Sequence, residues 1–237
     1  MKKAKSLLLG AGIATMLLAA CQSEPVSNLT ASGLDPAAFD STINNKPVKL
    51  YTLKNGNGME VCITNFGGRV VSLVVPDRNE TPTDVVLGYD NLKQYTDSVN
   101  SPSDFGSTVG RYANRINKGK LTVAGKKYQL PRNNFGHCLH GGPSGWMYQV
   151  YDADQPNDTT LKLKIVSPDG DNGFPGTVTA TATYTVLSDN TLDIKFEATT
   201  DKETVVNMTN HSYFNLNGDP SKPGTNMILY VNADYFT

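Results

Sequence analysis

The chain has 237 residues, and its 21 lysines and arginines nearly balance its 22 aspartates and glutamates to leave a net charge of −1. This balance argues against a dedicated nucleic-acid-binding protein, which would carry a basic excess. A content of 38% apolar and 18% charged residues excludes both a disordered polyelectrolyte and a multispanning membrane protein. The many glycines and prolines favour one soluble, turn-rich domain built from short strands.

The N-terminus has the features of a secretion signal. Lysines within residues 1–5 precede an apolar stretch over residues 7–20. A helix of that length, about 21 Å, is too short for a hydrocarbon core of about 30 Å, so residues 1–20 are expected to be a signal peptide. Small residues stand directly before Cys21, an arrangement that resembles the bacterial lipoprotein lipobox. It implies cleavage before Cys21 and acylation of its thiol; the alternative is an ordinary signal peptide with an incidental cysteine.

Residues 21–45 are polar, contain Pro25 and Pro36, and show no periodicity. We therefore expect an acylated cysteine followed by a flexible tether. This would place the protein in the bacterial cell envelope, on the periplasmic or outer-membrane side, in contact with the membrane only through its lipid. The remaining cysteines, Cys62 and Cys138, are compatible with a disulfide in an oxidising compartment, but unpaired, semi-buried thiols are the expectation.

From residue 46 onward, apolar and polar side chains alternate with a period of two. The alternation is clearest in three segments, residues 161–165, 177–187 and 192–198, and it is typical of a strand that is buried on one face. Sequences that favour turns separate such segments, at residues 55–58, 168–170 and 188–190. No helical period extends over three turns, so residues 46–237 are predicted to form one large antiparallel β-sandwich or barrel.

Two glycines and a proline follow His140. Because they remove neighbouring side chains, the backbone there can approach a ligand closely, although a plain turn with an exposed histidine fits equally well. His137 and Cys138 precede it, and this spacing is compatible with a soft metal ion. A stable site needs three or four ligands, and no further His or Cys cluster supplies them, so no metal site is predicted.

His211 lies in a segment, residues 207–216, that is crowded with Asn, Ser and Tyr. These side chains suit the hydrogen bonding of a polyol, and an imidazole can give or take a proton near neutral pH; the alternative is a strand-end histidine that bonds to backbone. Arg111 and Arg115 flank Asn114. They are either two surface arginines in a loop or a polar fork for hydroxyls or developing charge.

These segments have the order and spacing found in aldose 1-epimerases, the galactose mutarotases. The sequence resembles that family over about residues 46–237, most clearly at residues 65–68, 76–78, 110–116, 139–142, 167–176 and 209–216. The resemblance implies a galactose-mutarotase-type β-sandwich and interconversion of the α and β anomers of aldohexoses such as glucose and galactose, without a metal or other cofactor.

The resemblance also implies roles for individual residues. His211 matches the general acid, and His140 matches a second catalytic histidine that contacts the sugar. The residues that match the family's substrate-binding positions are these two histidines and four others, Asn114, Arg115, Ser212 and Tyr213. No catalytic counterpart is assigned to Arg111, His137 or Cys138.

The family's base is a glutamate near its C-terminus, preceded by an acidic sugar-binding residue, and both fall beyond Thr237. Residues 227–236 resemble a family strand that stops at its end, and no Asp or Glu matches the base. The sandwich is therefore expected to be C-terminally truncated, with open edges and an uncovered apolar face. Because a positioned base contributes about 10²–10⁴-fold to a rate, the chain is expected to be an acid without its partner and to have little or no activity. Three alternatives remain open: a non-catalytic sugar-binding lipoprotein of the same fold, a related sugar-phosphate epimerase, and a structural or adhesive lipoprotein.

The lipobox leads to a direct prediction. The Cys21→Ser substitution is expected to abolish acylation, because it removes the thiol that would carry the lipid. Metabolic labelling with a palmitate analogue checks this, with the wild-type chain as the labelled reference. Continued labelling of the variant would contradict the lipobox.

Overall fold

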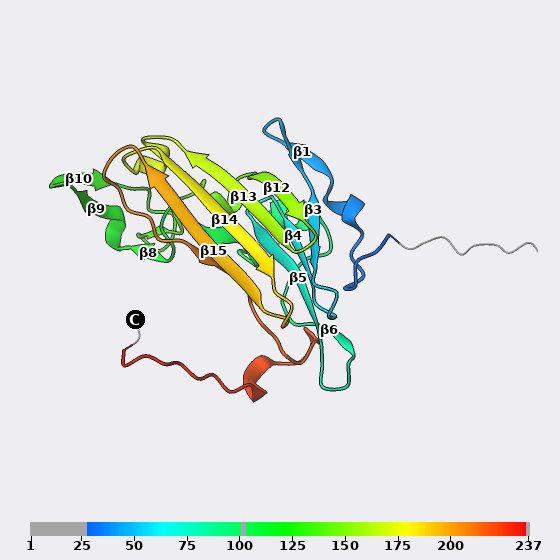
Figure 1. The fold of residues 1–237 in the computed structure, drawn as a ribbon. Coiled ribbons are helices and arrows are strands. Elements are labelled where there is room, and N and C mark those ends of the chain that lie inside the picture. The colour runs from blue at the N-terminus through cyan, green and yellow to red at the C-terminus, as the bar shows by residue number, and fades with distance from the viewer. Residues whose placement is uncertain (1–27, 101–102, 236–237) are drawn as a thin grey trace, which may run out of the picture.

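The computed structural model describes residues 28–100 and 103–235. These residues contain two four-stranded antiparallel sheets and four two-stranded ribbons (Figure 1). The first sheet has the order β3 (Leu50–Lys54), β4 (Glu60–Thr64), β5 (Arg69–Pro76) and β6 (Pro82–Asp84). The second has the order β12 (Asp152–Asn157), β13 (Thr160–Ser167), β14 (Val178–Val186) and β15 (Leu192–Thr200). One core cluster joins the two sheets, so the predicted antiparallel β-sandwich is confirmed.

The second sheet has the alternation that the sequence predicts. Every second side chain of β14 is buried, and β13 alternates in the same way. The buried face of β14 packs against the first sheet through five side chains, Val178, Ala180, Ala182, Tyr184 and Val186. A fully buried Val or Leu contributes about 1.5–3 kcal/mol to stability, so the register of these strands is fixed by their apolar faces. The three predicted turns lie between consecutive elements.

The two central strands of the first sheet are buried on both faces. No residue of β4 is exposed, and only the last two residues of β5 are partly exposed. The outer face is covered by η1 (Pro36–Phe39), the hairpin of β1 (Ser41–Ile43) and β2 (Lys46–Val48), and α1 (Leu92–Thr96). Their side chains pack in one cluster with Cys62 and Val71. A sheet that is covered on both sides needs apolar residues at consecutive positions, which explains why β5 does not alternate.

The tether expected over residues 21–45 is wrong for its described part, residues 28–45. Phe39 is completely buried and Leu34 nearly so, both in the cluster on the first sheet. The backbone N–H of Ala31 donates to Glu60, and β1 pairs with β2. Three apolar side chains of this segment pack in that cluster, Leu34, Phe39 and the partly buried Ile43, too few to produce a periodic pattern. Residues 1–27, with the expected signal peptide and Cys21, lie outside the described residues.

Short ribbons bring distant segments together at one end of the sandwich. β7 (Thr108–Val109) pairs with β16 (Thr209–Asn210), and β8 (Arg115–Ile116) pairs with β11 (Cys138–Leu139). The remaining elements are β9 (Lys120–Val123), β10 (Lys126–Gln129), η2 (Asn117–Gly119), η3 (Trp146–Tyr148), η4 (Asp171–Gly173) and η5 (Gly224–Asn226). As a result, three of the sequence motifs, around residues 110–116, 139–142 and 209–213, lie at the same place.

Two further expectations are decided by the structure. Cys62 and Cys138 are unpaired, as predicted, but fully buried in separate clusters. The strand expected over residues 227–236 is not formed in its described part, since residues 227–235 pair with no neighbouring strand and Ile228 and Leu229 are almost fully exposed. Among the described helices, none combines the length and the apolar character needed to cross a membrane.

Arg111 is a buried structural residue, which corrects the interpretation as a surface arginine. Its Nη1 donates to the carbonyl oxygens of Pro175 and Gly176, at 2.9 and 2.8 Å. Its Nη2 donates to both the carbonyl and the hydroxyl of Ser167. The side chain therefore ties the segment after β7 to the connection between β13 and β14. A loop carbonyl that is buried must find a donor, and Arg111 supplies several.

The Arg111→Ala substitution is expected to destabilise the fold by about 3 kcal/mol or more, because each buried carbonyl left without a donor costs about 1–3 kcal/mol. Urea unfolding of the two chains measures the difference. The exposed Arg78 provides the control, since Arg78→Ala should stay within about 0.5 kcal/mol of the wild type. A loss below about 1 kcal/mol for Arg111→Ala would show that these bonds are not needed.

Candidate active site

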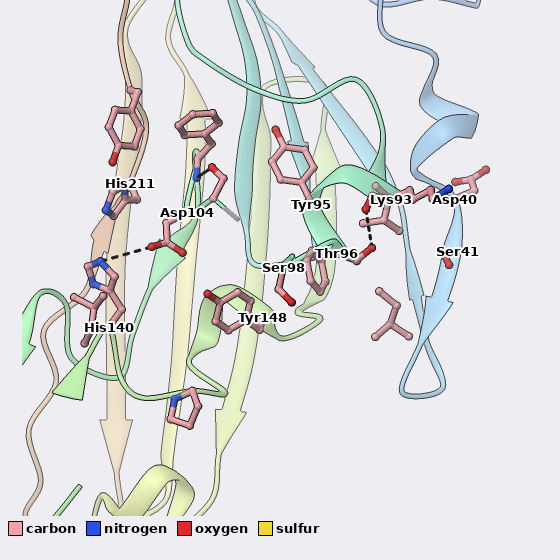
Figure 2. A pocket seen from close by; sticks show the side chains of 18 of the residues that line it. Asp40, Ser41, Lys93, Tyr95, Thr96, Ser98, Asp104, His140, Tyr148 and His211 are labelled. Carbon is pink, nitrogen blue, oxygen red and sulfur yellow. Dashed lines mark hydrogen bonds and ion pairs between the residues drawn. The ribbon is translucent and has the colours of Figure 1, made fainter. Parts of the chain in front are cut away.

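A cavity of about 1230 Å³ opens where the short ribbons meet the first sheet (Figure 2). One end of it lies beside η1, β1 and α1, where Asp40, Ser41, Lys93 and Thr96 line the wall. The other end is formed by the loop before β7, the segment after β11 and the segment after β16. That end carries a group of side chains able to exchange protons or hydrogen bonds: Asp104, Arg115, His140, Tyr148, His211 and Tyr213.

His140 is held by two hydrogen bonds to Asn114. The backbone N–H of His140 donates to the Asn114 carbonyl at 2.9 Å, and the backbone N–H of Asn114 donates to Nδ1 of the imidazole at 3.0 Å. Because Nδ1 accepts this bond, the proton of the neutral ring lies on Nε2. His140 therefore offers the cavity an N–H donor.

Gly141 allows two segments of the protein to pack closely together. The sequence instead suggested that the glycines of this turn let a ligand approach the backbone. It has a φ of +82°, and a Cβ there would lie 2.3 Å from the carbonyl oxygen of Gly110. The residue is therefore glycine because two loops touch at this point. The contact holds the His140 turn against the segment that carries Arg111.

Burial lowers the pKa of His140, and the charge of Asp104 works against this shift. His211 and Arg115 lower the pKa further. His140 is thus neutral around neutral pH, in agreement with its acceptor role at Nδ1. The pKa of His140 is lower in the folded chain than in the unfolded chain, where it is about 6.5. The neutral imidazole therefore stabilises the folded chain in full at a pH above about 6.5. The contribution is lost as the pH falls through the folded-state pKa.

His211 lies next to His140 at the same end of the cavity (Figure 2). The two rings meet edge to face, with centroids 5.2 Å apart and planes at 88°. The backbone of His211 is fully paired, since its N–H donates to Ser107 and its carbonyl accepts from Gly106. The backbone of His211 is thus tied into the sheet end, as one interpretation of this residue predicts, while its imidazole lines the cavity.

Of the other residues predicted to bind substrate, Arg115 and Tyr213 line the cavity. The guanidinium of Arg115 is held by Asn134 through Nε at 3.1 Å and Nη2 at 2.8 Å, and the ring of Tyr213 lies 5.3 Å from that of His211. Asn114 and Ser212 do not line the cavity. Asn114 instead positions His140, and the backbone N–H of Ser212 bonds to a neighbouring asparagine.

Sequence reasoning missed three residues at this site: Arg69, Asp104 and Tyr148. Arg69 is completely buried, and its Nη1 donates to the carbonyls of Ser103 and Phe105, on either side of Asp104. Its Nη2 donates to the carbonyl of Met147, next to Tyr148. These three residues lie far apart in the chain and share no short motif, so a single sequence carries no signal that would join them.

Ligand atoms of Asp104, His140 and His211 lie within 4.8 Å of one another, a spacing that a metal ion could use. The hydrogen bond from Asn114 to Nδ1 argues against it, because the proton on Nε2 occupies the lone pair that would bind the metal. His137 and Cys138 do not join His140: Nδ1 of His137 accepts from the backbone of Lys118, and Cys138 is buried in a separate cluster. The arrangement suits donors and acceptors for hydroxyl groups.

The chain matches the family model described as aldose 1-epimerase over residues 49–237. It is 36% identical over 190 residues to the aldose 1-epimerase of Escherichia coli K12, a match that covers 80% of this chain and 54% of the relative. It is 39% identical over 178 residues to the galactose mutarotase of Sus scrofa, covering 75% of this chain and 51% of the relative. The chain thus spans about half the length of these curated relatives.

Solved structures of similar proteins share the fold. A crystal structure of an aldose epimerase homologue from C. elegans superposes with a TM-score of 0.67 at 33% identity, covering 71% of this chain and 51% of that chain. The galactose 1-epimerase of Lactobacillus acidophilus NCFM superposes with a TM-score of 0.65 at 30% identity, covering 74% of this chain and 51% of that chain.

The Asp104→Asn substitution is expected to lower the pKa of His140 further, because the negative charge that opposes the effect of burial is removed. A pH titration of the His140 Cε1–H resonance by NMR measures the shift. Asp154→Asn removes an equal charge from the exposed face of β12 and should leave the resonance unchanged. An unchanged or raised pKa in Asp104→Asn would contradict the described geometry.

Proposed function

The chain belongs to the aldose 1-epimerase family, and we propose that its cavity binds aldohexoses such as glucose and galactose and interconverts their α and β anomers. The observation that carries the proposal is the meeting of His140 and His211, edge to face, at the end of a cavity that Arg115 and Tyr213 also line. Such a site offers both hydrogen-bond donors for sugar hydroxyls and an imidazole for proton transfer.

In the proposed reaction, His211 acts as the general acid. As an imidazolium it donates a proton to the ring oxygen of the sugar, while the anomeric hydroxyl loses its proton to solvent water, since no residue of this chain is assigned as the base. The bond between the anomeric carbon and the ring oxygen breaks, and the electron pair of the anomeric oxygen forms the aldehyde. After rotation of the aldehyde end, the reverse transfers close the ring with either configuration.

The other residues of the site bind and orient the sugar. Neutral His140 donates from Nε2 to a sugar oxygen, and Arg115 donates from a guanidinium that Asn134 already holds in place. Because these donors are fixed before the sugar arrives, little conformational entropy is lost when it binds. Tyr213 adds an aromatic face, 46% exposed, next to His211.

We also propose that the protein is held in the cell envelope by a lipid on Cys21. This rests on the lipobox resemblance alone, because residues 1–27 lie outside the described residues.

Polarimetry of freshly dissolved α-glucose and α-galactose, with and without the purified chain, tests the proposed activity. With His211 as the acid and water as the base, we expect a rate above the spontaneous background but about 10²–10⁴-fold below that of a site with a positioned base. A background rate together with measurable sugar binding would contradict turnover and favour a non-catalytic sugar-binding protein of the same fold. A folded chain that neither binds sugar nor accelerates the reaction would contradict the whole proposal.

The His211→Ala substitution is expected to reduce the accelerated part of the rate by about 10²-fold or more, because a positioned general acid contributes about 10²–10⁴-fold. The matched control is His137→Ala, since that histidine bonds to Lys118 and does not line the cavity; it should keep the wild-type rate. A His211→Ala rate within about threefold of the wild type would remove His211 from the mechanism.

A further inference from the structure

Asp104 is a carboxylate at the centre of the site, and no motif of the sequence assigns a role to it. In Figure 2 it lies between His140, His211 and Tyr148. Its Oδ2 is 3.9 Å from Nε2 of His140, and its side chain is 25% exposed. It therefore faces the cavity and remains accessible to a small ligand.

The gap between Asp104 and His140 has the size of one bridging oxygen. A distance of 3.9 Å is too long for a direct hydrogen bond, but an oxygen atom placed between the two groups can bond to both, as bridging waters do. Nor do the two groups form an ion pair near neutral pH, because burial keeps His140 neutral. The pair is thus open to a third group.

The chemistry of the two groups defines what that third group is. Nε2 of His140 carries a proton and donates, because Nδ1 already accepts from Asn114. An ionised carboxylate only accepts. The bridging group must therefore accept one hydrogen bond and donate another, which is what a hydroxyl does. A phosphate or carboxylate would meet the like charge of Asp104, so neutral sugars are favoured over sugar phosphates and sugar acids.

The backbone that carries the Asp104 side chain is held in this position by its own loop. The N–H and the hydroxyl of Ser107 both donate to the backbone carbonyl of Asp104, at 3.1 and 2.8 Å. Buried Arg69 binds the carbonyls of Ser103 and Phe105 on either side. A side chain on a loop that is fixed at both flanks costs little to order when a ligand binds.

We propose that Asp104 is a further sugar-binding residue, and that Asp104 and His140 together hold one sugar hydroxyl as acceptor and donor. This inference rests on the proposed function, since it names a contact within the same site. It assigns to Asp104 a role in selecting sugars by the presence and orientation of one hydroxyl group.

Isothermal titration calorimetry of the full chain with galactose, glucose and their monodeoxy analogues tests the inference. Wild type is expected to bind one deoxy analogue about 10-fold or more weakly than the parent sugar, since a hydrogen bond to a charged group contributes about 1.5–3 kcal/mol. Asp104→Ala should bind the parent sugar about 10-fold more weakly. It should show no further loss with that same analogue, because the partner of the missing hydroxyl is already gone. Asp154→Ala is the control and should bind every sugar as the wild type does.

Three results would overturn the inference. If the Asp104→Ala variant binds the parent sugar as tightly as the wild type, the contact is excluded. If the variant loses the same affinity for the parent sugar and for every deoxy analogue, Asp104 has only a structural role. A wild-type chain that binds no aldose contradicts this inference and the proposed function together, whereas the first two results leave the proposed function intact. If Asp104→Ala does not fold, Asp104→Asn preserves the shape of the side chain and is expected to weaken binding of the parent sugar in the same selective way.

Discussion

The site depends on the buried guanidinium of Arg69. This side chain is completely buried, yet its hydrogen-bond partners are three backbone carbonyls, those of Ser103, Phe105 and Met147. Burial of a charged group is costly unless its donors are satisfied. Here the loop before β7 and the short helix η3 supply acceptors to both Nη atoms, whereas the buried Nε has no hydrogen-bond partner. The rings of Phe66 and Tyr95 lie against the guanidinium and add cation–π attraction. Through this one side chain, the end of β5 fixes both segments that carry Asp104 and Tyr148.

Arg111 repeats the arrangement on the other side of the site. It too is buried, and it too binds loop carbonyls, in this case between β13 and β14. The two arginines act as connectors between a rigid sandwich and the irregular segments that line the cavity. Because a buried loop must satisfy its backbone carbonyls somewhere, the two Nη groups of a guanidinium are an efficient solution, although Nε of each arginine is buried without a hydrogen-bond partner.

The electrostatics of the site suit a neutral polyol. A backbone N–H determines the tautomer of His140, so one N–H points toward the cavity without a positive charge. Asp104 brings an acceptor beside that donor, and Arg115 brings a donor already held by Asn134. The side chains of His140 and Arg115 and the backbone of Asp104 are fixed by protein contacts before any ligand binds, which favours selective hydrogen bonding with small entropic loss.

The sequence by itself determined the local part of this protein: the alternation of β13 and β14, the turns between strands, and the motifs around His140 and His211, because these depend on residues close together in the chain. It did not determine which segments pack on the outer face of the first sheet, so the docking of Phe39 was missed, as were the burial of Arg111 and the packing role of Gly141. Only the tertiary structure decided that Asp104 lies beside His140. That proximity arises from hydrogen bonds of Arg69 to carbonyls more than 30 residues away. Because every residue has a backbone carbonyl, the sequence does not indicate which carbonyls Arg69 binds.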